Sequence, residues 1–171
     1  MKGGYDVNEK PGFKKETAIV GLIVAAWLVV TLVILSLFGI SQGWPAFLTL
    51  IFFFEAGAKT ENLKNIFVGA VVGILLGAAL HLLGGALAPA LGVDLALLLI
   101  VFVIVFLIIF LGDVAHMFFN NYTFCYFCVS TIFSEPATLE WLAVLLLGGL
   151  FFTGGILGII KLIIRDKETQ S

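Results

Sequence analysis

Residues 65–89, NIFVGAVVGILLGAALHLLGGALAP, decide which kind of fold this chain can adopt. The stretch carries no Asp, Glu, Lys or Arg and exceeds the roughly 20 residues that a helix needs to cross a bilayer. Residues four apart share one face of such a helix, and here they are Gly69, Gly73, Gly77, His81 and Gly85. Glycines lack Cβ atoms, so another helix can approach this face closely. We therefore expect a transmembrane helix with a packing face.

The composition extends this interpretation to the whole chain. Of its 171 residues, 61% are hydrophobic and 12% are charged, against about 45–50% and about 25% in ordinary soluble domains. The lipid bilayer is therefore the first predicted partner. A net charge of −2 offers no basic field for nucleic acid. Two cysteines are too few for a disulfide framework.

Residues 65–89 form one of six segments in which the apolar residues of the chain are concentrated. We expect an all-α polytopic membrane protein with a transmembrane domain at 18–164, between cytosolic tails at 1–17 and 165–171. The expected segments are 18–40, 44–56, 65–89, 95–119, 122–133 and 137–164.

Two of these segments, 44–56 and 122–133, are much shorter than the others. About 12 helical residues span roughly 18 Å, against a hydrocarbon core of about 30 Å. One interpretation is a pair of half-helices, with Ser41-Gln42 and Asn120-Asn121 as polar breaks that line a water-filled cavity. The alternative is that the helices begin earlier, at Ser41 or at Val114.

Charge placement predicts the topology. If all six segments cross, every basic residue falls on one side, which the positive-inside rule identifies as cytoplasmic, with both termini there. These residues are Lys2, Lys10, Lys14, Lys15, Lys59, Lys64, Lys161, Arg165 and Lys167.

When the sequence is aligned with itself at an offset of 77 residues, 18–40 aligns with 95–117. Each half then consists of a long, a short and a long apolar segment. A further four-residue shift brings Gly73 and Gly77 over Gly154 and Gly158, which we also expect to be packing positions. Halves of three crossings, 18–89 and 95–164, would be inverted in the membrane, as is common in transporters. Unrelated hydrophobic segments also show some self-similarity, so duplication is a hypothesis.

Ionisable residues inside the segments are candidate pathway residues. His81 is expected toward the outer leaflet. Asp113 and His116, three residues apart on the fourth segment, are expected to share a helix face at the cytoplasmic end. Because these groups should not meet, we predict no metal site. Each group could instead be structural, and Glu55 with Lys59 is expected to form a surface pair.

Cys125 and Cys128 form a Cys-x-x-Cys motif on an apolar segment. Such a motif can be a redox pair where a thiolate is stabilised, whereas free cysteines are often small buried hydrophobic residues. We predict no catalytic residue and no cofactor, and we do not expect an enzyme.

The segment Trp44-Pro-Ala-Phe47, with Phe53, the link at 57–64 and the glycine-rich run at 65–81, resembles the YcdZ-like family of small bacterial inner-membrane proteins. The resemblance spans most of residues 18–160. It implies a bacterial inner-membrane location and six helices, and it assigns no functional residues.

Three functions remain as hypotheses. The first is a small inverted-repeat channel or facilitator for a small solute, oligomeric through its glycine faces, with His81 and the polar breaks near the route. The second is a non-transporting membrane subunit or assembly factor. The third is a membrane thiol oxidoreductase.

Overall fold

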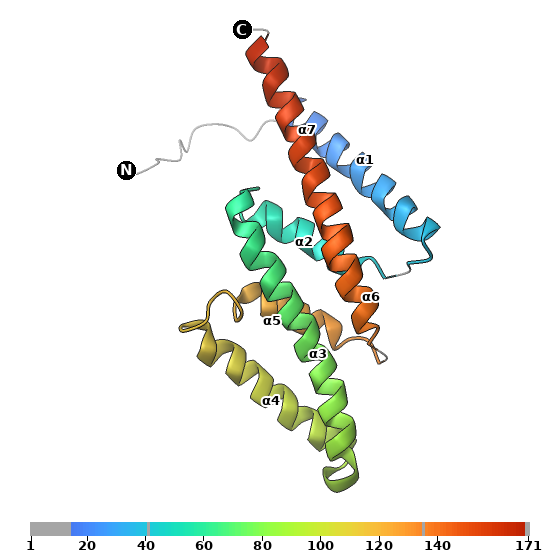
Figure 1. Cartoon of the computed structure of the whole chain (residues 1–171), viewed down its shortest axis with the longest axis vertical. Helices are drawn as coiled ribbons and strands as arrows, with labels where there is room; N and C mark the ends of the chain where they lie inside the picture. The colour runs from blue at the N-terminus through green and yellow to red at the C-terminus, as the bar shows by residue number, and fades with distance from the viewer. Residues whose placement is uncertain (1–14, 41, 135, 170–171) are drawn as a thin grey trace.

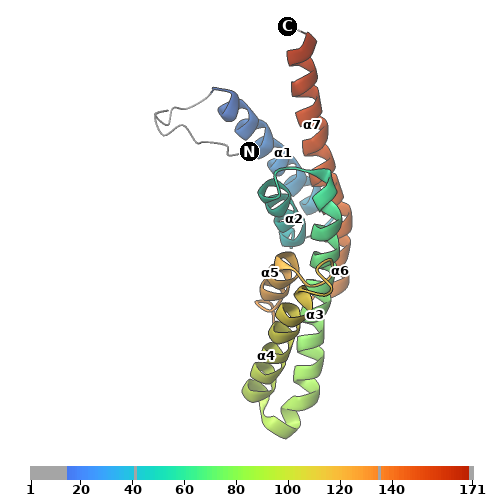
Figure 2. The same ribbon diagram turned by 90° about the vertical axis from the view of Figure 1, so that its left-hand side faces the viewer.

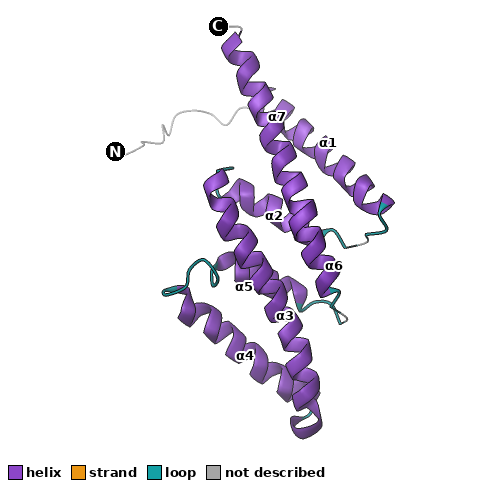
Figure 3. Ribbon diagram, in the orientation of Figure 1, coloured by secondary structure: helices purple, strands orange, loops and turns teal. Residues whose placement is uncertain are grey.

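The computed structural model describes residues 15–40, 42–134 and 136–169, and in these ranges it contains helices and no strand (Figure 3). The last three elements, α6, η2 and α7, form one continuous helix in which η2 is a π-helical turn. The elements are α1 (Lys15–Leu37), α2 (Trp44–Glu55), η1 (Thr60–Asn62), α3 (Leu63–Leu91), α4 (Val93–Gly112), α5 (Asn121–Ser130), α6 (Thr138–Ala143), η2 (Val144–Gly148) and α7 (Gly149–Thr169).

The expected all-α polytopic membrane fold is confirmed. Helices long and apolar enough to cross a membrane cover Thr60–Leu91, Val93–Gly112 and Thr138–Ile159, and shorter apolar helices cover Gly21–Leu37 and Trp44–Glu55. Many large apolar side chains point outward from these helices; Phe102 on α4, for example, is 70% exposed. Such a surface is stable in contact with lipid and not with water.

The two short segments are short helices. α2 has 12 residues and α5 has 10, so they are about 18 Å and 15 Å long, roughly half of the hydrocarbon thickness. They begin at Trp44 and Asn121, so the alternative that they start earlier, at Ser41 or Val114, is wrong for both.

The fourth segment is shorter than expected, because α4 ends at Gly112. Asp113 and His116 therefore lie in the turns that connect α4 to α5, and the prediction that they share a helix face is wrong. The helix ends here because the connection is tied to Asn120, whose side-chain amide donates hydrogen bonds to the carbonyls of His116 and Met117.

The helices form two layers (Figures 1 and 2). One layer contains α3 and the continuous helix α6–α7, and the other contains α1, α2, α5 and α4. α3 packs mainly against α5 and α4, whereas α7 packs mainly against α2 and α1. The last helix of each half of the chain thus packs against the first two helices of the other half.

The α3–α5 contact is the most extensive, and it uses the glycine face of α3. A Cβ atom on Gly73 would lie 2.5 Å from the carbonyl oxygen of Thr123, and one on Gly77 would overlap the side chain of Ser130. Gly69 similarly faces Asn120. These three glycines allow the backbones to approach closely.

The other predicted packing glycines have no such neighbours within the described part of the chain. A Cβ atom on Gly85, Gly154 or Gly158 would meet nothing within 4 Å. The close contacts of the last helix are made instead by Gly148 against Ala46, Gly149 against Phe67 and Thr49, and Gly155 against Trp27. For packing inside the described part of one chain, the prediction for Gly85, Gly154 and Gly158 is therefore wrong. Contacts with a second molecule through these faces stay a prediction.

A leucine at position 73 tests the α3–α5 contact. Gly73→Leu forces a side chain into the backbone of α5, so we expect a loss of more than about 2 kcal/mol, toward the upper end of overpacking costs. The readout is the midpoint of thermal unfolding in detergent. Gly85→Leu, on the same helix with open space around it, is the matched control and should leave the midpoint unchanged. Equal midpoints for the two variants would show that the close approach does not stabilise the fold.

Candidate functional site

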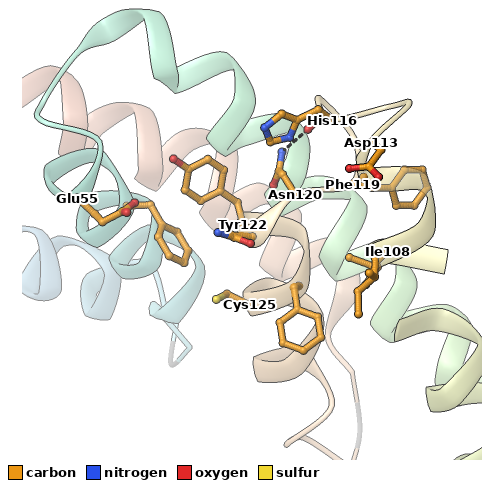
Figure 4. Close-up of a pocket in the computed structure, with 13 residues that line it drawn as sticks. Glu55, Ile108, Asp113, His116, Phe119, Asn120, Tyr122 and Cys125 are labelled. Atoms are coloured by element: carbon orange, nitrogen blue, oxygen red, sulfur yellow. Dashed lines mark hydrogen bonds between the residues drawn. The ribbon is translucent and has the colours of Figure 1, made fainter. Parts of the chain in front are cut away.

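A cavity of about 970 Å³ opens where α2 ends, α4 ends and α5 begins. Figure 4 shows side chains from these three elements pointing into it. Its polar lining comes from Glu55, Asp113, His116, Asn120, Asn121 and Tyr122. We call this space the polar cavity. Polar groups converging in a hollow of an otherwise apolar helical protein make it the candidate functional site.

Asn120 and Thr123 shape one wall of the polar cavity. The side-chain oxygen of Asn120 accepts a hydrogen bond from the backbone N–H of Thr123 at 3.1 Å, and the Asn120 N–H donates to the Thr123 hydroxyl at 3.4 Å. This reciprocal capping box satisfies two donors at the start of α5. The Thr123 hydroxyl also donates to the carbonyl of Phe118 at 2.7 Å. The connection 113–120 is thereby fixed in place beside the cavity.

The charges that line the polar cavity are acidic. Glu55 and Asp113 contribute carboxylates, and neither Lys nor Arg is among the lining residues in the described part of the chain. Lys59 lies 4.0 Å from Glu61, both on the surface, so the expected pairing of Lys59 with Glu55 is not observed. An uncompensated acidic lining raises the local concentration of cations and disfavours anions.

Aromatic side chains close the inner end of the polar cavity, between α2 and α5. The ring centroids of Tyr122 and Phe52 are 5.0 Å apart, and those of Phe52 and Tyr126 are 6.0 Å apart. The ring of Trp44 comes next, with its centroid 5.8 Å from that of Tyr126. At the far end, Trp44 meets Trp141 at 5.3 Å. These rings form a continuous aromatic column along the contact of the two short helices.

The predicted pathway residues divide between two places. Asp113, His116, Asn120 and Asn121 all line the polar cavity; the first three belong to the α4–α5 connection, and Asn121 is the first residue of α5. His81 instead lines a separate, shallow depression of about 520 Å³ with Ser134, Pro136 and Ala137. As expected, His81 does not meet Asp113 or His116.

The His81 depression lies near the far end of the aromatic column, because Phe133, next to Ser134, packs on Trp44 with ring centroids 6.1 Å apart. The Nε2 atom of His81 is buried and has no hydrogen-bond partner within the described structure. Gln42 accepts a hydrogen bond of 2.6 Å from the indole of Trp141. Ser41 lies outside the described residues.

The two cysteines occupy different surroundings on α5. Cys125 lines the polar cavity, Cys128 is exposed on the outside, and both thiols are free. In the part of the chain that the structure describes, no group of three or more His, Cys, Asp or Glu side chains could hold a metal ion.

Reasoning from the sequence missed four residues of this region. Glu55, expected in a surface pair with Lys59, and Tyr122 line the polar cavity, and Thr49 bonds to Tyr126 beyond it. A signal for the last pair was present, because Thr49 and Tyr126 are 77 residues apart, the offset of the hypothesised repeat.

Comparison with known proteins gives one match. A family model described as "Protein of unknown function (DUF1097)" matches residues 18–161. No curated protein and no solved structure matches the chain.

Replacing Asn120 tests how the cavity wall is held. Asn120→Ala removes the cap of α5 and both ties to the connection, so we expect a loss of about 1–2 kcal/mol and faster hydrogen exchange across 113–120. Asn120→Asp keeps the capping oxygen and loses only the amide donors, so its effect should be smaller. Asn121→Ala, exposed at the next position, is the control. An unchanged exchange rate in Asn120→Ala would contradict this account of the wall.

Proposed function

The chain belongs to the DUF1097 family, whose function is unknown, and we propose from its geometry that it is a channel or facilitator for a small polar solute. The observation that carries the proposal is the polar cavity, which opens beside the junction of two half-length helices inside an apolar fold. The proposed route runs from this cavity along the aromatic column to the His81 depression.

The half-length helices support a transport function. Non-helical backbone is tolerated at membrane depth only where it is buried in protein or lines an aqueous cavity. Asp113, His116, Phe119 and Asn120 of the α4–α5 connection line the polar cavity, next to the first turn of α5, which supports an aqueous cavity there. Secondary transporters and channels place their binding sites at the ends of broken helices in the same way.

The reciprocal packing of the halves gives a second line of support. In Figure 1, a half-turn about the line of sight brings α1, α2 and α3 close to the places of α4, α5 and α6–α7. This arrangement agrees with an inverted repeat, in which the pathway lies at the contact between the halves. The polar cavity is at that contact, because α2 belongs to one half and α4 and α5 to the other.

The acidic lining favours particular solutes. Small cations and neutral hydrogen-bonding solutes are expected to enter the cavity, and carboxylates such as formate are expected to be rejected. Lys59 follows the lining residue Glu55 by four positions, and Lys64 lies in the first turn of α3. The positive-inside rule would therefore place the cavity mouth in the cytoplasm of a bacterial inner membrane, with both termini on that side.

A non-transporting membrane subunit is the second candidate, and one observation favours it. No open passage joins the two ends of the proposed route in the described structure, because Tyr126 and Thr49 are completely buried between them. The exposed faces of α4 and α7 would then contact a partner subunit or a second copy instead of lipid.

Solute flux separates the candidates. In proteoliposomes followed by stopped-flow light scattering, we expect urea, glycerol or ammonium to enter faster than in protein-free vesicles, and formate and acetate not to. Neutralising the cavity with Glu55→Gln and Asp113→Asn together should lower ammonium flux about tenfold, within the range that electrostatic focusing provides. His81→Phe should lower the flux of every permeant solute if the depression is the far mouth.

The matched control is Glu140→Gln, which removes an exposed carboxylate on α6 that does not line the polar cavity. It should leave all fluxes unchanged. If no solute crosses faster than in protein-free vesicles, the channel proposal is wrong, and co-purification of a membrane partner becomes the test of the second candidate.

A further inference from the structure

Thr49 and Tyr126 meet at the centre of the molecule. They lie near the midpoints of α2 and α5, and their separation of 77 residues is the offset that relates the two halves. Two positions related by a half-turn can touch only close to its axis. The pair therefore marks the line about which the halves are arranged in Figure 1.

Hydrogen bonds join the two short helices at this point. The Tyr126 hydroxyl donates to the carbonyl of Pro45 at 2.7 Å and lies 2.7 Å from the Thr49 hydroxyl. Thr49 is also 2.9 Å from the same carbonyl. Tyr126 and Thr49 are 0% exposed, so water does not compete for these bonds.

The two long helices of the other layer leave little room for this pair to move. A Cβ atom on Gly73 of α3 would lie 2.7 Å from the Cβ atom of Tyr126, and a Cβ atom on Gly149 of α7 would lie 3.2 Å from the Thr49 hydroxyl. Gly149 directly follows the π-helical turn, a feature that is frequent at functional sites.

The pair also separates the two ends of the route. Toward the polar cavity, Tyr126 contacts Phe52, a lining residue; toward the His81 depression, it contacts Trp44. A solute in the polar cavity would have to pass this point to reach the other side along the aromatic column.

We propose that the hydrogen-bonded Thr49–Tyr126 pair is the barrier of the route, and that it opens when α2 and α5 separate. A passing solute would replace the broken bonds with its own bonds to the two hydroxyls and the Pro45 carbonyl, so the barrier selects solutes that donate hydrogen bonds, as ammonium, urea and glycerol do. This inference rests on the proposed function.

Cys125 is a natural reporter for the test, because it lines the polar cavity one residue before Tyr126. In a Cys128→Ser background, sealed vesicles of each orientation are treated with a membrane-impermeant trimethylammonium thiosulfonate. The unsubstituted pair should allow rapid modification of Cys125 from the cavity side and only slow modification from the far side. Tyr126→Ala should allow modification from both sides.

Two milder variants keep the test informative if Tyr126→Ala fails to fold. Tyr126→Phe and Thr49→Val each remove one hydroxyl and little volume. Thr49→Val removes one of the two bonds between α2 and α5 and should raise the rate of modification from the far side about fivefold, the change in an equilibrium constant expected from one lost hydrogen bond. Tyr126→Phe removes both of these bonds and should raise the rate further. Thr153→Val is the matched control, since this buried hydroxyl bonds only to carbonyls of its own helix and should change nothing.

The outcomes distinguish the two proposals. If Cys125 reacts from neither side in the unsubstituted protein, the cavity is not aqueous and the proposed function fails with the barrier. If it reacts from the cavity side alone in every folded variant, the barrier is not at Thr49–Tyr126, whereas the channel proposal stands. Equal acceleration by Thr153→Val would show a general loosening and would also overturn the barrier.

Discussion

The close approach of α5 to the glycine face of α3 is the contact on which the rest of the structure depends. A 10-residue helix that carries Thr123 and Ser130 is not stable facing lipid, because its polar groups and its ends would lack partners. Gly69, Gly73 and Gly77 remove the side chains that would hold α5 away, and both hydroxyl-bearing residues become completely buried. Close packing, not exclusion of water, holds helices together in a bilayer.

Burial of a short helix creates the polar cavity as a consequence. A helix that covers half the membrane leaves the remaining depth to connecting backbone, which needs hydrogen-bond partners of its own. Asn120 supplies them for the connection 113–120 by binding the carbonyls of His116 and Met117. At the far end of the aromatic column, Gln42 and Trp141 join the segment before α2 to α6. The polar groups that a route would need are therefore already required by the fold.

Much of the fold could be predicted from the sequence, because hydropathy and glycine spacing are local properties. The short helices and the polar break at Asn120 could be predicted because they depend only on residues that are neighbours in the sequence. The end of α4 was not, since the side chain of Asn120, eight residues later, fixes the turns that follow Gly112. Glu55 could not be placed in the cavity because its neighbours there come from α4 and α5, which only tertiary packing brings to α2.

The two glycine-bearing helices do not match position by position. Aligning Gly154 and Gly158 with Gly73 and Gly77 places exposed positions of the last helix over buried positions of α3. The close contacts of the last helix come instead from Gly149, against Thr49, and from Gly155, against Trp27. These two glycines are six residues apart and therefore lie on different faces of the helix. The bare backbone of Gly149 lies against Thr49, as that of Gly73 lies against Tyr126, and one threonine and one tyrosine fill this central space, so the halves differ at the point where they meet.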